Sequence, residues 1–123
     1  MSGLDRVLAA LAAVAGGLGV AASAAAAHTS GGETLRTAAQ FLLFHAPAIL
    51  ALTGLAAAGL TRGALTRLAA AALLIGLVLF SGDLALRALT GTPLFPMAAP
   101  SGGVVLMAGW LLAAVAVLIP TRR

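Results

Sequence analysis

Four long apolar stretches, separated by short polar connectors, constrain this chain more than any other feature. They cover residues 7–27, 38–60, 68–89 and 103–119. A helix of about 20 apolar residues spans the hydrocarbon core of a bilayer. The composition agrees, because only 8% of the residues are charged, whereas a soluble domain carries about 25%. We therefore predict an all-α, integral membrane four-helix bundle in which residues 1–123 form a single membrane domain.

The arginines predict the orientation of this bundle. Four spans would place both termini and the central loop on one side of the membrane, which would then carry Arg6, Arg62, Arg67, Arg122 and Arg123. The other side would carry Arg36 and Arg87, which are matched by Glu33 and Asp83. Because basic residues gather in cytoplasmic loops, we expect both termini to be cytoplasmic. Arginines at the ends of apolar stretches fit a lipid bilayer as the partner and do not suggest nucleic acid.

The first apolar stretch has two interpretations. Arg6 and the small residues Ala25–Ala27 would suit a signal peptide with a cleavage site. The apolar core of a signal peptide has about 7–15 residues, however, and residues 7–27 are more numerous than that. We therefore expect a retained transmembrane helix.

Asp83 is the acidic residue that lies inside an apolar stretch, where an ionised carboxylate is costly unless it is paired. Arg87 follows four residues later, so the two side chains share a helix face and can pair. We favour an internal ion pair that orients this helix. The alternatives are a carboxylate that relays protons or binds a cation, and an interfacial position at which both side chains reach water.

A candidate polar pocket is predicted near the outer leaflet. His28 directly follows the first stretch and His45 lies early in the second, while Ser81, Asp83 and Arg87 lie late in the third. We interpret His45 as a histidine that donates to a neighbouring group, with a metal ligand or proton carrier as the alternative. No catalytic motif, metal-ligand spacing or cysteine is present, so we assign no catalytic residue, metal or cofactor.

Small residues and one tryptophan predict close packing of helices, because glycine lets two helix backbones approach. Trp110, seven residues into the fourth stretch, needs an acceptor for its indole N–H when buried. A place in an interhelical groove is favoured over contact with a ligand. Ser101 is expected to cap the fourth helix. The predicted packing residues are Gly82, Gly102, Gly103, Gly109 and Trp110.

Short motifs in this chain resemble those of a known family. They are Ala27-His28, Phe44-His45-x-x-Ala48, Leu79-Phe80-Ser81-Gly82, and Pro100-x-Gly102-Gly103 followed by Gly109-Trp110. In this order they resemble motifs of the small bacterial and mitochondrial membrane proteins grouped as domain of unknown function 423, or transmembrane protein 256. Ser23, Ala26 and Asp83 depart from the family pattern. The resemblance implies a four-helix protein of the bacterial inner membrane with a retained first helix, and it implies no established activity.

Two classes of function are therefore considered. The first is a structural or interaction component of the membrane, which would form a homo-oligomer or bind another membrane protein. The abundant small residues and short loops of this chain favour this class. The alternative is a small transporter or channel with His28, His45 and Asp83 near one mouth. A membrane enzyme is not predicted, because no catalytic set is evident.

Overall fold

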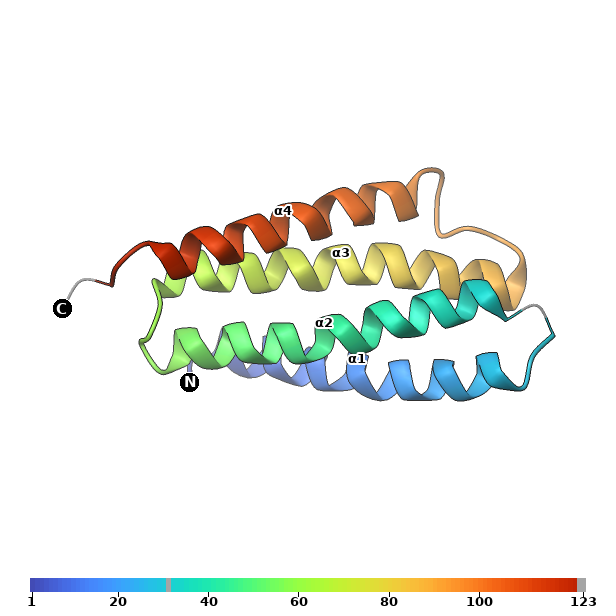
Figure 1. Cartoon of the computed structure of the whole chain (residues 1–123), viewed down its shortest axis with the longest axis horizontal. Coiled ribbons are helices and arrows are strands. Elements are labelled where there is room, and N and C mark those ends of the chain that lie inside the picture. Colours follow the sequence, from blue (N-terminus) through green and yellow to red (C-terminus); the bar gives the residue numbers. More distant parts are fainter. Residues whose placement is uncertain (31, 122–123) are drawn as a thin grey trace.

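The computed structural model describes residues 1–30 and 32–121, which form four helices and no strand (Figure 1). They are α1 (Gly3–Ala27), α2 (Glu33–Ala57), α3 (Gly63–Thr90) and α4 (Ala98–Leu118). Consecutive helices run in opposite directions, so the start of α1, the α2–α3 loop and the end of α4 lie at the same end of the molecule (Figure 1). Each helix is long and apolar enough to cross a membrane. The all-α, four-helix architecture predicted from the sequence is confirmed.

Each helix begins several residues before the apolar stretch that it contains, and at two helix ends a local cap accounts for the boundary. At the start of α1, the Ser2 hydroxyl accepts from the N–H of Asp5, and the Asp5 carboxylate accepts from the N–H of Ser2. This reciprocal pair is a capping box. At the end of α3, Gly91 has φ 78°, a left-handed conformation that glycine adopts without a Cβ penalty.

The start of α4 differs from the expectation for Ser101. The helix begins at Ala98, so Ser101 lies within its first turns and is not its cap. The cap position belongs to Met97, which has φ 68° and makes no side-chain cap bond. Pro100 is tolerated here because N–H groups in the first turn have no partner within the helix. The proline-rich connector is therefore shorter than the sequence suggested.

The helices pack mainly against their neighbours in the sequence. α2 packs on both α1 and α3, whereas α4 packs chiefly on α3 (Figure 1). The contact between α1 and α3 is much smaller. The buried core is formed by alanine and larger aliphatic side chains, including Ala12, Ile49, Leu73 and Leu77. Many large apolar side chains remain exposed on the lateral surface, as expected for helices whose solvent is lipid.

Candidate functional site

α3 and α4 approach each other at glycines. A Cβ added at Gly102 would lie 2.6 Å from the backbone nitrogen of Phe80 and 2.8 Å from the carbonyl oxygen of Gly76. A Cβ added at Gly109 would lie 2.8 Å from a methyl carbon of Leu73. These separations are shorter than real Cβ contacts. The close approach of the two helix backbones at Gly102 therefore requires glycine.

The other two predicted packing glycines lie outside this tight contact. A Cβ at Gly103 would meet nothing within 4 Å, and one at Gly82 would meet only the Leu94 side chain, at 3.4 Å. Gly103 is therefore a natural control for Gly102, since the two glycines are neighbours in α4 but only one touches α3.

His45 and Trp110 link α2 to α4. The indole N–H of Trp110 donates to Nε2 of His45 over 3.1 Å. Nδ1 of His45 lies 2.8 Å from the carbonyl oxygen of Phe41, and because a carbonyl can only accept, Nδ1 carries the proton. The network therefore assigns His45 the neutral tautomer with both ring nitrogens bonded. His45 is 5% exposed and Trp110 is 48% exposed, so the indole lies at the surface of the interhelical groove.

Phe41 and Phe80 continue this contact from α2 to α3. The Phe41 ring stacks on His45 with a centroid separation of 5.6 Å and lies 4.3 Å from the Phe80 ring. Aromatic pairs at such distances add packing energy beyond the area they bury. We call Phe41, His45, Phe80 and Trp110 the aromatic cluster. It joins three helices and contains residues from three of the motifs that carry the family resemblance.

Ser81 adds a direct bond between α3 and α2. Its buried hydroxyl donates to the carbonyl oxygen of Ala38 over 3.0 Å. That carbonyl lies in the first turns of α2. A hydroxyl bonded across two helices is satisfied without water, which is the arrangement that a membrane interior favours.

Asp83 is buried and both of its carboxylate oxygens are bonded. Oδ2 accepts from Nε of Arg87 over 2.8 Å, which is the predicted pair between residues four apart. Oδ1 accepts from the backbone N–H of Leu94, also over 2.8 Å. Leu94 lies in the connector between α3 and α4, so Asp83 anchors this loop to the end of α3. The sequence analysis did not foresee this second role.

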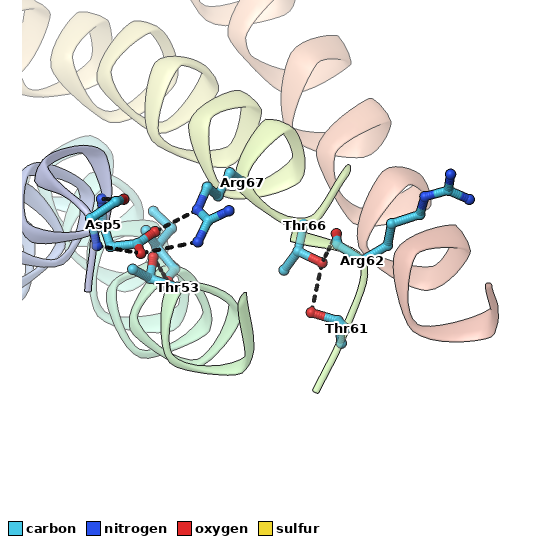
Figure 2. Close-up of polar contacts among 8 residues, drawn as sticks. Asp5, Thr53, Thr61, Arg62, Thr66 and Arg67 are labelled. Carbon is cyan, nitrogen blue, oxygen red and sulfur yellow. Dashed lines mark hydrogen bonds and ion pairs between the residues drawn. The ribbon is translucent and has the colours of Figure 1, made fainter. Parts of the chain in front are cut away.

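A second buried carboxylate, that of Asp5 (Figure 2), belongs to the first turn of α1. The start of α1 and the end of α3 lie at opposite ends of the molecule (Figure 1). Arg67 of α3 binds the Asp5 carboxylate through two contacts, Nε to Oδ1 at 2.7 Å and Nη2 to Oδ2 at 3.1 Å. Two parallel bonds between a guanidinium and a carboxylate are strong and geometrically specific. The Arg62 side chain points away from this pair (Figure 2). The ion pair therefore joins α1 to α3.

The sequence analysis missed the pair of Asp5 and Arg67 because Asp5 precedes the first apolar stretch. Two signals could have found it. Ser2 and Asp5 have the spacing of a capping box, which places Asp5 in the first turn of a helix. Asp5 is also the only acidic residue on the arginine-rich side of the predicted bundle, so several arginines were available to pair with it.

Buried threonines near this ion pair are also bonded. The Thr66 hydroxyl lies 2.8 Å from the Thr61 hydroxyl and 2.9 Å from the carbonyl oxygen of Arg62 (Figure 2). The Thr53 hydroxyl donates to the carbonyl oxygen of Ile49 over 2.7 Å. Across residues 1–30 and 32–121, no buried side-chain nitrogen or oxygen lacks a hydrogen-bond partner. The polar interior is therefore internally satisfied.

Of the five residues of the candidate polar pocket, only Asp83 and Arg87 bond to each other. Asp83 pairs with Arg87, whereas Ser81 and His45 bond to the groups described above. His28 is exposed at the end of α1. Within the described residues, no group of three or more histidine or acidic side chains is arranged to hold a metal ion.

The larger described cavity is an apolar groove between α1 and α3, with a volume of about 580 Å³. Its walls come from residues 11–25 of α1 and 74–89 of α3, and Leu35 and Leu42 of α2 also line it. Of the five predicted pocket residues, Ser81 alone lines this groove, and its hydroxyl is bonded to Ala38.

The four helices are long and apolar enough to cross a membrane, and their buried polar side chains are hydrogen-bonded within the protein. These features define the class of multi-pass helical membrane proteins. The model of the family described as "Protein of unknown function (DUF423)" matches residues 12–103, from within α1 to the start of α4. The chain belongs to this family, as its motifs indicated. Searches of curated proteins and of solved structures give no match.

Proposed function

We propose that this chain is a structural or interaction component of the bacterial inner membrane, with no enzymatic activity. The observation that carries the proposal is the use of its polar side chains. His45, Ser81 and Asp5 each bond to another helix, and Asp83 bonds to the connector before α4. Groups that are occupied in joining segments are not free to bind a substrate or to exchange protons with water.

The proposed orientation has both termini in the cytoplasm. Arg6, Arg62 and Arg67 belong to the end of the molecule that contains the α2–α3 loop, while Arg122 and Arg123 lie outside the described residues. The positive-inside rule assigns an arginine-rich end to the cytoplasm. Phosphatase and fluorescent-protein fusions at the C-terminus test this, and we expect fluorescence without phosphatase activity. A phosphatase-active C-terminal fusion would overturn the orientation.

The alternative, a small transporter or channel, has less support. Both oxygens of the Asp83 carboxylate accept internal hydrogen bonds, and the larger described cavity is lined almost wholly by apolar side chains. A transport pathway for polar solutes needs polar groups along a water-filled route. In the described part of the chain, the buried polar side chains form bonds within the protein and do not line such a route.

The proposed partner is a second copy of this chain or another membrane protein. Val104, Leu111 and Leu118 form an exposed stripe on α4, since residues seven apart lie on nearly the same face. The opposite stripe, which contains Gly109 and Ala113, is buried against the protein. An exposed face on a helix that packs chiefly on one neighbour is available for association within the membrane.

Cysteine cross-linking tests this assembly. The chain contains no cysteine of its own, so any disulfide to the chain involves the introduced residue. We expect Leu111→Cys to form disulfide-linked dimers in native membranes under mild oxidation, or cross-links to one other membrane protein. Ala113→Cys, at a buried position on the same helix, is the matched control and should form none. A protein that remains monomeric in membranes and in mild detergent, without a cross-linked partner, would contradict the proposal.

A further inference from the structure

The outward face of α2 carries a polar side chain for which the described part of the chain provides no partner. Gln40 is exposed on α2. The α2 side chains that form hydrogen bonds within the described residues are those of Thr37, His45 and Thr53, and Gln40 is not among them. Its carboxamide can donate two hydrogen bonds and accept two. This bonding capacity therefore faces the surroundings of the protein.

Gln40 lies at the depth of the hydrocarbon core. His45 is the central residue of α2 and bonds to Trp110 near the centre of α4, so it marks the middle of the bundle. Gln40 precedes His45 by five residues, or about 7.5 Å along the helix, whereas the hydrocarbon core extends about 15 Å to each side of its centre. A polar group without a bond is costly there, because the core contains no water. The carboxamide therefore requires a partner that lipid does not supply.

Gly54 is a second residue of this face that packing within the protein does not explain. It is exposed, and an added Cβ would meet nothing within 4 Å. Glycine is less favourable than alanine within a helix, and the close approach to α3 that requires glycine at Gly102 has no equivalent here. A glycine on the outer face of a membrane helix allows a helix of another molecule to approach closely.

Gln40 and Gly54 belong to one exposed stripe of α2. Its residues recur in steps of four and three, at Gln40, Phe44, Pro47, Ala51 and Gly54. This is the spacing of the seam along which two helices pack in a left-handed pair. In a parallel, symmetric pair each seam residue meets its equivalent at the same depth. Two copies inserted in one membrane with the same topology have parallel α2 helices, so the Gln40 side chains of the two copies would meet.

We propose that the outward face of α2 binds a second copy of this chain, in a symmetric dimer whose two Gln40 carboxamides hydrogen-bond to each other. The proposal rests on the membrane location and interaction role proposed above, and it concerns a surface other than the exposed stripe on α4. A carboxamide is complementary to itself, since its N–H groups donate and its carbonyl oxygen accepts. A second copy therefore supplies both groups at the depth of Gln40, and the small residues Ala51 and Gly54 let the two α2 helices approach.

Association in vesicles tests the role of Gln40. Chains fused at the C-terminus to a donor or an acceptor fluorescent protein are reconstituted together, and energy transfer is measured as the protein-to-lipid ratio is lowered. Gln40→Leu removes the carboxamide at similar volume and should weaken association about threefold to twentyfold, which corresponds to the measured range for side-chain bonds between membrane helices. Gly54→Leu should also weaken association. Gly17→Leu, at an exposed glycine of α1 where an added Cβ also meets nothing, is the matched control and should associate as the wild type does. Wild-type association in Gln40→Leu would overturn the proposal.

Disulfide formation locates the surface and leaves Gln40 in place. Ala51→Cys puts the thiols of two copies beside the symmetry axis, so we expect a disulfide-linked dimer of the chain in native membranes under mild oxidation. Leu50→Cys, at an exposed position of α2 beside the stripe, is the control and should form much less dimer. A disulfide from Leu111→Cys with none from Ala51→Cys, or a link from Ala51→Cys to a different protein, would refute the α2 dimer and leave the interaction role intact. The absence of both disulfides and of energy transfer would refute the two proposals together.

Discussion

Trp110 of α4 donates its indole N–H to Nε2 of His45 in α2 over 3.1 Å, and this bond joins two helices that otherwise touch little. α4 packs chiefly on α3, so the position of α4 relative to α2 depends on this contact and on the rings around it. His45 can accept from Trp110 because its Nδ1 is held as a donor to the carbonyl of Phe41. The backbone of α2 thus determines the tautomer that α4 requires.

The bond between His45 and Trp110 should contribute measurably to stability. Interhelical side-chain hydrogen bonds in membrane proteins are worth about 0.6 kcal/mol on average and up to about 1.7 kcal/mol. We therefore expect Trp110→Phe and His45→Phe to be non-additive, with a coupling free energy in this range. A double-mutant cycle of unfolding in mixed micelles, followed by circular dichroism, measures it. Strictly additive effects would indicate that the two side chains do not interact.

Gly102 should tolerate no side chain, whereas Gly103 should. Alanine at Gly102 would clash with the backbone of α3, and overpacking of this kind typically costs about 1–3 kcal/mol. Alanine at Gly103 meets nothing within 4 Å and should be neutral or stabilising by up to about 1 kcal/mol, because alanine favours helix. Thermal unfolding of the two variants, compared in the same detergent, gives the difference. Equal losses at both positions would contradict the described contact of α3 and α4.

Arg67 should matter more to stability than its exposed neighbour Arg62. Arg67→Gln leaves the buried Asp5 carboxylate with the N–H of Ser2 but without its guanidinium, and a buried charge that lacks an opposite charge is unfavourable. Arg62→Gln changes a side chain that points away from this pair (Figure 2) and is the matched control. We expect a lower midpoint of thermal unfolding for Arg67→Gln and an unchanged midpoint for Arg62→Gln.

Replacing both partners of the ion pair gives a further comparison. Asp5→Asn combined with Arg67→Gln removes both charges, so the desolvation cost of the remaining partner disappears. The double variant should therefore unfold at a higher temperature than Arg67→Gln alone. A double variant that is as unstable as the sum of the two single variants would show that the pairing of charge is not the cause.

The sequence predicted the four helices because a long apolar stretch with few charges has few other folds in lipid. It also predicted the pairing of Asp83 with Arg87, since both residues lie on one helix and their spacing is local. It did not predict the bond from Asp5 to Arg67 or that from Trp110 to His45. Those bonds join residues more than 60 positions apart, so they depend on which helix faces meet. Alanine and glycine are too frequent here for periodicity to specify those faces.

Anchoring of the connector by Asp83 predicts a specific effect of substitution on the loop before α4. If Asp83 anchors the loop, Asp83→Ala leaves the N–H of Leu94 without its acceptor, and exchange of that amide with deuterium should rise roughly tenfold. Asp83→Asn retains an oxygen that can accept from Leu94 and should raise exchange less. Ser101→Ala, in the first turns of α4, is the control and should leave exchange unchanged, because Ser101 does not cap the helix. Exchange that is the same in the wild type and in all three variants would remove Asp83 as the anchor of the loop.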